Sequence, residues 1–152
     1  MTAYVVRHAK AGDRSEWTGD DRLRPLTKSG RQQADALADR LEPEPINNIL
    51  SSAYLRCLQT VEPLGLRRKL PVEPVQELEE GAGAEGVLQL VEKFRGCNVV
   101  LCTHGDVVEE LLERLIAQGL VQRARAMMEK GSTWVLDETS GKITGARYLA
   151  AP

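Results

Sequence analysis

Short runs of β-branched and apolar residues alternate with longer amphipathic segments along the whole chain. The clearest strands are expected at Thr2–Arg7, Asn47–Ser51 and Asn98–Thr103, with helical periodicity between and after them. This alternation predicts an α/β domain in which helices cover a central sheet. At 152 residues the chain has the length of one ordinary globular domain, so we expect a single domain over residues 1–152.

Start and stop signals place the helices. Thr27 is a candidate N-cap, and the helix after it should stop before Pro43. A second helix is expected over Ala53–Leu64, where Pro63 should end it early. A third is indicated by the apolar face of Val87, Leu88, Leu90, Val91 and Phe94, and a fourth is expected over Val107–Ala117.

Three further segments complete the expected secondary structure. Leu70–Val75 contains two prolines, so it can form an edge strand at most. Thr133–Asp137 and Ile143–Tyr148 are extended and separated by a short turn, which predicts a terminal hairpin. The polar stretch from Ala9 to Pro25 reads as a long loop, and loops of this length are usually functional or mobile.

Charge and composition exclude several classes of protein. A net charge of −2 argues against a nucleic-acid binder, which would carry a basic excess. No apolar run approaches the roughly 20 residues that span a bilayer, and the start does not resemble a signal peptide. Three cysteines in unrelated contexts suit a reducing compartment. We therefore expect a cytoplasmic protein that binds neither nucleic acid nor membrane.

The only two histidines both follow predicted strands. His8 comes after Thr2–Arg7, and His104 comes directly after Asn98–Thr103 and before Gly105. In open α/β sheets, ligands bind at the carboxyl ends of the strands. Both imidazoles are therefore expected at the same site, together with Arg7.

A third segment follows the same logic. The strand ending at Ser51 runs into a helix whose first backbone N–H groups are unpaired, and such a helix start binds anions. Arg56, one turn along, can add a bidentate guanidinium fork. Ser52, and Gly105 after the other strand, are accordingly expected to bind the substrate.

Two imidazoles and two guanidiniums, without a metal cluster or a nucleotide loop, suit phosphoryl transfer to a histidine nitrogen. The guanidiniums would neutralise the phosphoryl oxygens, and a nearby acid would protonate the leaving group. His8 is the better nucleophile because Arg7 is adjacent and the following loop can orient its other ring nitrogen.

These residues also carry a resemblance to a known family. The motifs are RHA at Arg7–Ala9, SSxxxRCxQT at Ser51–Thr60 and CTHGD at Cys102–Asp106. Together they resemble the histidine phosphatase, or phosphoglycerate-mutase-like, superfamily. The segment DRLRPLTKSG at Asp21–Gly30 and the short chain look like the SixA-type phosphohistidine phosphatases. The resemblance spans roughly residues 3 to 106.

The resemblance implies an α/β fold, a three-layer αβα sandwich with a mixed, mostly parallel central sheet. It also implies a phosphohistidine intermediate on His8 and a phosphate pocket formed by Arg7, Arg56 and His104. No metal and no organic cofactor is needed in that mechanism. The family's usual RHG is RHA in this chain, as is common in the SixA-like branch.

The resemblance also implies a proton donor. The family places a Glu in an L-x-E stretch, which Leu78-Glu79-Glu80 matches, so Glu80 is the expected acid. Glu77 and Glu79 are close enough in sequence to compete for this role. The short link to the next helix leaves little room for a capping insert, and an open site would suit a protein surface.

Three further features of the sequence bear on the site. Arg22 and Arg24, in the long loop, are candidate contacts to an anionic substrate, or else solvated loop residues. The GxGxxG stretch at Gly81–Gly86 follows no buried strand, so it is better read as a turn before a helix than as a dinucleotide site. None of the cysteines is followed six residues later by arginine, which excludes a cysteine-dependent phosphatase.

Three functions remain open at this point. The first is hydrolysis of phosphohistidine on a protein, and the second is hydrolysis of a small phosphorylated metabolite or nucleotide. The third is a module that recognises phosphate without turnover. In each case the partner is a phosphorylated protein or metabolite, and the chain is expected to be a monomer or weak dimer.

Overall fold

The computed structural model describes all 152 residues and has one six-stranded sheet with the order β3-β2-β4-β1-β5-β6. The strands are β1 (Thr2–Arg7), β2 (Asn48–Ser51), β3 (Val72–Pro74), β4 (Val99–Thr103), β5 (Thr133–Thr139) and β6 (Lys142–Leu149). β1 to β4 are mutually parallel, whereas β5 and β6 are antiparallel additions. The sheet is therefore mixed and mostly parallel, as the resemblance implied.

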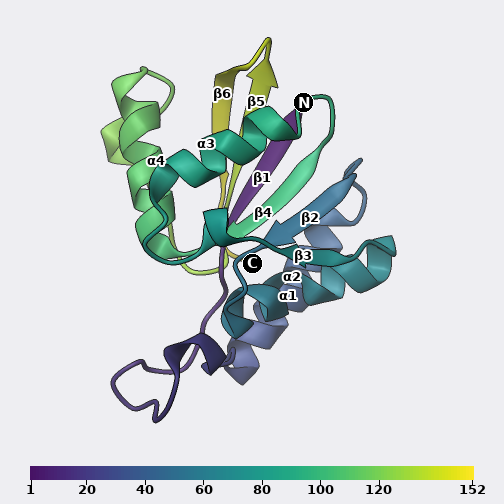
Figure 1. Cartoon of the computed structure of the whole chain (residues 1–152), viewed down its shortest axis with the longest axis vertical. Coiled ribbons are helices and arrows are strands. Elements are labelled where there is room, and N and C mark those ends of the chain that lie inside the picture. Colours follow the sequence, from purple (N-terminus) through teal and green to yellow (C-terminus); the bar gives the residue numbers. More distant parts are fainter.

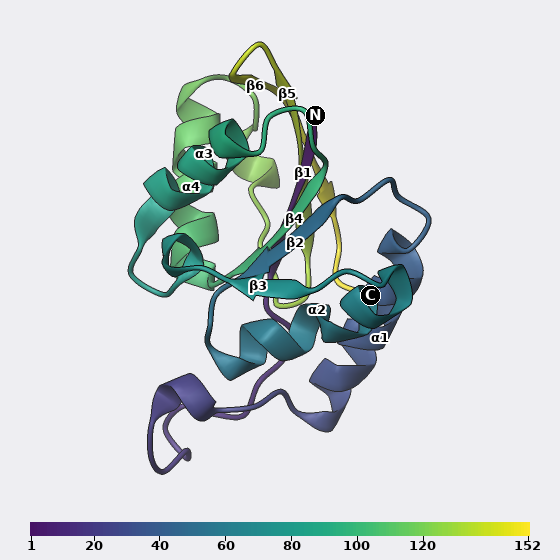
Figure 2. The ribbon, with the colours of Figure 1, turned by 45° about the vertical axis from the view of Figure 1, so that its right-hand side comes forward.

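Four helices cover the sheet in two layers (Figures 1 and 2). They are α1 (Lys28–Leu41), α2 (Leu55–Arg68), α3 (Gly83–Lys93) and α4 (Gly105–Ala117). α1 and α2 pack on one face, and α3 and α4 pack on the other. The short 3₁₀ turns are η1 (Asp21–Leu23), η2 (Gln76–Leu78) and η3 (Arg123–Arg125). The expected three-layer αβα sandwich is confirmed.

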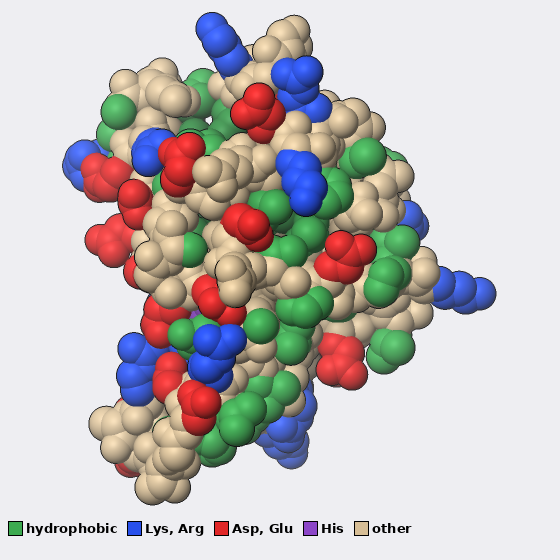
Figure 3. Space-filling view, viewed as in Figure 1, with side chains coloured by type: hydrophobic (Ala, Val, Ile, Leu, Met, Phe, Trp, Pro, Cys, Tyr) green, Lys and Arg blue, Asp and Glu red, His purple; other side chains and the backbone are tan.

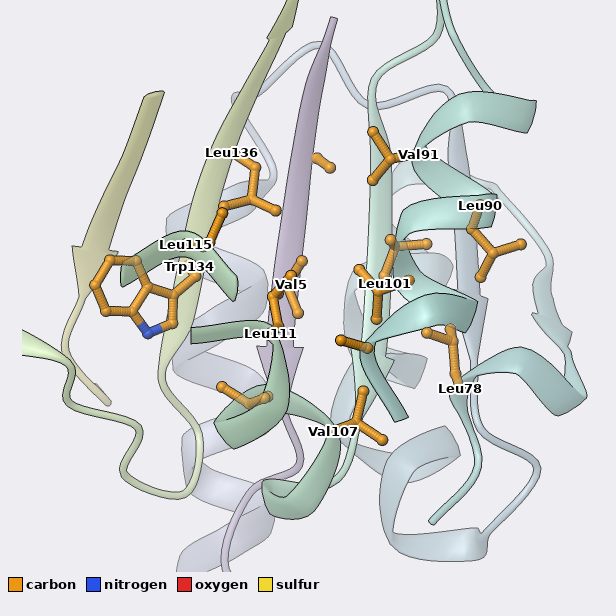
Figure 4. Close-up of a cluster of buried hydrophobic side chains, with 14 of the residues drawn as sticks. Val5, Leu78, Leu90, Val91, Leu101, Val107, Leu111, Leu115, Trp134 and Leu136 are labelled. Carbon is orange, nitrogen blue, oxygen red and sulfur yellow. The ribbon is translucent and has the colours of Figure 1, made fainter. Parts of the chain in front are cut away.

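Both faces of the central strands are buried, which explains their continuous apolar sequences. On β1, Val5 belongs to the core beneath α3 and α4, whereas Tyr4 and Val6 belong to the core beneath α1 and α2. Figure 4 shows Val5 among the side chains of the first of these cores, with Leu111 of α4 also in it. Parallel strands with helices on both faces read as apolar runs rather than as alternation.

Local sequence signals predicted the start of α1 correctly and the end of α2 incorrectly. Thr27 caps α1 as predicted, since its hydroxyl accepts the backbone N–H of Gly30 at 3.0 Å. The predicted end of α2 was wrong, because the helix passes through Pro63 and continues to Arg68. A proline there removes only one N–H donor, and the buried packing of Leu64 beyond it compensates.

The two ends of the sheet agree with the sequence. β3, with its prolines, is an edge strand beside β2. β5 and β6 form the predicted terminal hairpin, turning at Ser140 and Gly141, which both have positive φ. No helix is long and apolar enough to cross a membrane.

The loop between β1 and α1 is fastened to the first turns of α1. Lys10 donates its backbone N–H to the side chain of Gln33 at 2.9 Å, and its carbonyl accepts the N–H of Thr27 at 3.0 Å. Gly30 makes this approach possible, because a Cβ there would lie 1.9 Å from the Lys10 carbonyl oxygen. Glycine at position 30 therefore lets the loop after His8 pack directly against α1.

Replacing Gly30 by alanine should destabilise the protein, although alanine is the better helix former by about 1 kcal/mol. The added methyl group must displace the Lys10 backbone, so we expect a net loss of about 2 kcal/mol in the free energy of unfolding. Urea unfolding measures this loss. Gln32→Ala, on the exposed face of α1, is the control, and equal stabilities of the two variants would contradict the prediction.

Candidate active site

A cavity of about 700 Å³ opens at the carboxyl ends of β1 and β4. Arg7, His8, Arg24, Glu80, His104, Gly105 and Lys130 are among the residues that line it. Lys, Arg, Asp and Glu side chains are interspersed in this region beside the Ala9–Pro25 loop, and little of the histidine colour is visible (Figure 3). The structure thus gathers residues from distant parts of the chain around one recess.

His8 presents one ring nitrogen with a lone pair. Its Nδ1 lies 2.8 Å from the carbonyl oxygen of Ala9, which can only accept, so Nδ1 carries the proton and Nε2 does not. The side chain of Thr60 accepts the Ala9 N–H at 2.9 Å and fixes this peptide. His8 is 7% exposed. These contacts hold the imidazole in the tautomer that a nucleophile requires.

The pKa of His8 is lowered to about 3. Burial is the main cause, and the nearby His104, Arg56 and Arg7 also lower it, whereas the hydrogen bond to Ala9 opposes the shift. The ring is therefore uncharged at neutral pH. A neutral imidazole is the form that can attack an electrophile.

The two imidazoles lie next to each other. The ring centroids of His8 and His104 are 5.6 Å apart, and the planes meet at 68°. His104 is the N-cap of α4, so the unpaired N–H groups of the helix start at the same place. Ser52 Oγ is 2.8 Å from His104 Nε2, and the other nitrogen, Nδ1, is buried without a partner.

Arg7, the last residue of β1, contacts the chain that follows α4. Its Nη1 donates to the carbonyl of Met128 at 2.6 Å. Its guanidinium also packs against Gly105, where a Cβ would lie 2.8 Å from Nη2. Burial lowers the pKa of Arg7 from its ordinary value. The glycine after His104 therefore leaves room for the guanidinium.

Arg56 is fully buried and is held by the Ala9–Pro25 loop. Its Nη1 donates to the backbone carbonyl of Asp21 at 2.9 Å, and its Nη2 donates to Asp21 Oδ2 at 3.1 Å. Asp21 also accepts Arg24 Nε at 2.9 Å. Although burial raises the pKa of Asp21, these contacts hold it below its ordinary value. The carboxylate therefore orients two arginines at once.

Three buried side-chain nitrogens in this region have no partner. They are Arg7 Nε, Arg56 Nε and His104 Nδ1, out of five unpartnered buried side-chain N and O atoms in the chain. A buried polar group left unpaired costs about 1–3 kcal/mol, so native proteins rarely tolerate several together. Arg7 and His104 line the cavity, whereas Arg56 is fully buried and lies 3.8 Å from Glu80, which lines it. Unpaired nitrogens in and next to the cavity indicate a site for an anion with several acceptor oxygens.

Of the three candidate acids, Glu80 lines the cavity, and Glu77 and Glu79 do not. Glu80 Oε1 pairs with Arg14 Nη2 at 2.7 Å, and its Oε2 lies 3.8 Å from Arg56 Nη2. Glu79 instead pairs with Arg22 at 2.9 Å. Glu80 therefore lines the same cavity as the two histidines, and Glu79 does not.

The residues expected to bind the substrate divide into two groups. Arg24 and Gly105 line the cavity. Arg22 lies outside it, with its guanidinium 4.9 Å from the centre of the Tyr54 ring. Ser52 has no exposed surface and contacts His104 rather than the cavity.

The sequence did not single out several residues that complete the site. Asp21 stands at the head of the DRLRPLT segment, which was the one available signal. Met128 and Lys130 have no motif of their own and reach the cavity because Gly131 N–H is bonded to the backbone carbonyls of Arg7 and His8. No group of three or more His, Cys, Asp or Glu side chains is arranged to hold a metal ion.

Comparison with known proteins identifies relatives. Residues 3–85 match the model of the histidine phosphatase superfamily (branch 1). An 8-oxo-(d)GTP phosphatase of Mycolicibacterium smegmatis is 37% identical over 158 residues, covering 99% of this chain and 48% of that protein. The chain therefore spans about half the length of this relative.

Solved structures give the same picture of the fold. SixA from Agrobacterium tumefaciens superposes with a TM-score of 0.79 and 26% identity, covering 98% of this chain and 97% of that chain. The protein histidine phosphatase SixA complexed with tungstate gives a TM-score of 0.76 with 22% identity, covering 99% and 95%. Both likenesses extend over the complete sandwich, including the antiparallel hairpin.

The low pKa of His8 predicts a dependence of stability on pH. Between a folded pKa of about 3 and an unfolded value near 6.5, the unfolded chain binds a proton that the folded chain does not. The contribution of His8 to the free energy of unfolding therefore has its full value above pH 6.5. It falls as the pH drops below this value, by up to about 1.4 kcal/mol per pH unit.

Replacing His8 by asparagine should remove this slope, because the amide keeps a donor for the Ala9 carbonyl but cannot titrate. Urea unfolding of both proteins at pH 7.5, 6 and 4.5 measures it. The wild type should lose more stability than His8→Asn as the pH falls, and parallel curves would show that the wild-type ring is freely protonated.

Proposed function

The chain belongs to the histidine phosphatase superfamily, and on that basis we propose that it hydrolyses a phosphoryl group through a covalent intermediate on His8. The observation that carries the proposal is the uncharged His8 ring among three unpartnered buried nitrogens. Such a site fits a tetrahedral dianion with a nucleophile next to its centre.

In the first step, His8 Nε2 forms a bond to phosphorus as the bond from phosphorus to the leaving group breaks. Arg7 and Arg56 neutralise the phosphoryl oxygens, and His104 donates to one of them through Nδ1. Glu80, which lines the same cavity, is the group that protonates the departing atom. The product of this step is phosphohistidine at His8.

In the second step, water attacks phosphorus, the bond to His8 Nε2 breaks, and inorganic phosphate is released. Glu80 accepts the proton of the attacking water, which restores the group that acted in the first step. The hydrogen bond from Nδ1 to the Ala9 carbonyl keeps the ring in place throughout.

We further propose that the physiological substrate is phosphohistidine on a protein. Two of the arginines that line the cavity form ion pairs with acidic side chains. Arg14 pairs with Glu80, and Arg24 pairs with Asp21. Asp13, Asp106 and Glu109 add further negative charge to the lining, and Lys130 adds one positive charge. This balance favours a single phosphoryl group over a triphosphate chain, whose additional phosphates would meet acidic side chains.

The position of Glu80 supports the same substrate class. Both of its carboxylate oxygens face arginines, so the group is already engaged with Arg14 and Arg56. A phosphoramidate releases imidazole, which needs less assistance from an acid than an alkoxide does. Apart from the two histidines, the lining also has no aromatic ring on which a nucleobase would stack.

One observation favours a second candidate. The 8-oxo-(d)GTP phosphatase of Mycolicibacterium smegmatis matches nearly the whole chain at 37% identity. A nucleotide is therefore the alternative substrate class, with its terminal phosphoryl group bound at the same histidines.

The covalent intermediate should be trapped on His8. A protein bearing radiolabelled phosphohistidine is mixed with the enzyme and quenched in alkali, where phosphohistidine survives. The wild type should carry the label on His8, and His8→Asn should carry none while its kcat falls roughly a thousandfold or more. Gln32→Ala, on the exposed face of α1, serves as the control. Full turnover by His8→Asn would eliminate the mechanism.

The substrate class is tested by comparing kcat/KM across three kinds of compound. These are a phosphohistidine-bearing protein, the nucleotides dGTP and 8-oxo-dGTP, and p-nitrophenyl phosphate. We expect the phosphohistidine protein to be preferred over either nucleotide by at least about tenfold, which corresponds to 1.36 kcal/mol of transition-state stabilisation. A preference for nucleotides by the same margin would select the second candidate instead.

A further inference from the structure

The two ring nitrogens of His104 have different surroundings. Nε2 lies 2.8 Å from Ser52 Oγ and 3.5 Å from Cys57 Sγ, in the protein interior. Nδ1 is buried and has no partner in the protein. Which nitrogen carries the proton is therefore decided by what the neighbours of Nε2 can donate or accept.

The hydroxyl group of Ser52 makes two contacts, one with a backbone N–H group and one with His104. Its oxygen already accepts the backbone N–H of Tyr54 at 3.2 Å. The residue has no exposed surface, so water does not compete for its hydrogen. If the oxygen also accepted from Nε2, the hydroxyl hydrogen would have no acceptor. The acceptor left for that hydrogen is Nε2 of His104, which then holds a lone pair.

Cys57, the other neighbour of Nε2, donates its thiol hydrogen to the carbonyl of Thr103 at 3.7 Å. Burial favours this neutral thiol, whereas hydrogen bonds with Cys102 and His104 lower its pKa to about 6. We assign the choice of tautomer to the Ser52 hydroxyl because it is nearer to Nε2.

We infer that Ser52 is a positioning residue that fixes His104 as the Nδ1–H tautomer. The inference rests on the proposed function in one respect, namely that the Nδ1–H group then donates to a phosphoryl oxygen. If Nε2 carried the proton, Nδ1 would present a lone pair to the anion and repel it. Ser52 thus acts on the substrate only through the imidazole that it orients.

The ring is held from a second side. The Tyr54 ring packs edge-on against His104, with centroids 4.7 Å apart and an interplanar angle of 74°. Arg56 lies over the same tyrosine ring at 4.9 Å. Tyr54 restricts how the imidazole tilts, but it offers no hydrogen bond to Nε2, so the choice of tautomer falls to Ser52.

Ser51 provides a matched control. It is also fully buried, and its hydroxyl donates to the carbonyl of Ser52 at 2.8 Å without a hydrogen bond to His104. Ser51→Ala and Ser52→Ala therefore remove the same atoms from neighbouring buried positions. Only the second removes the donor to Nε2.

Nitrogen NMR of the protein with ¹⁵N-labelled histidine reads the tautomer directly. The chain has two histidines, and His8→Asn assigns the signals of His104. In the wild type and in Ser51→Ala, Nδ1 of His104 should be protonated and Nε2 should not. In Ser52→Ala the Nε2–H form should appear, and Ser52→Thr, which keeps the hydroxyl, should restore the original spectrum.

The kinetic effect should follow the spectrum. We expect kcat to fall about tenfold in Ser52→Ala, as for the loss of one hydrogen bond made in the transition state. Ser52→Thr should recover most of this loss, and Ser51→Ala should stay within about twofold of the wild type. Thermal unfolding of each variant separates this effect from a loss of fold.

Two results would overturn the inference. One is a protonated Nε2 on His104 in the wild type, which is decisive even if Ser52→Ala does not fold. The other is an unchanged tautomer in folded Ser52→Ala. If instead the spectra are as expected but no phosphorylated compound is hydrolysed, the role of Ser52 stands and the proposed function fails.

Discussion

The parallel register of three neighbouring strands is the constraint on which the site depends. β4 lies between β1 and β2, with Arg7 opposite Thr103 and Ser51 opposite Cys102. The ladder continues by one hydrogen bond on each side, from the N–H groups of the next residues to β4 carbonyls at 3.0 Å. The residues that follow the three strands are His8, Ser52 and His104. The pairing of the strands therefore places these three residues side by side, independently of any side-chain contact.

The fold then buries charge around these residues. Arg56 has no exposed surface, and burying a guanidinium is costly unless its hydrogens are used. The backbone and carboxylate of Asp21 take two of them, and the Met128 carbonyl takes one from Arg7. Of the nitrogens that remain unpaired here, those of Arg7 and His104 belong to residues that line the cavity, and Arg56 lies behind them. A stable core around the strands tolerates this local cost, and an anion bound there would relieve it.

Most of the architecture could be predicted from the sequence because it depends on local periodicity. Strands, the cap at Thr27 and the terminal hairpin each lie within a few residues of the pattern that predicts them. α2 is the exception, since its course beyond Pro63 is set by packing of Leu64 and its neighbours against the rest of the protein. A local rule about proline could not include that contribution.

The sequence by itself determined which residues follow the strands, and hence that two histidines and two arginines would meet. Only the tertiary structure decided what each of them contacts. Asp21 reaches Arg56 across 35 positions, Met128 reaches Arg7 across 121, and Ser52 reaches His104 across 52. Such pairings leave no periodic trace in the chain, because they depend on how the sheet and its loops are folded in space rather than on spacing along the sequence.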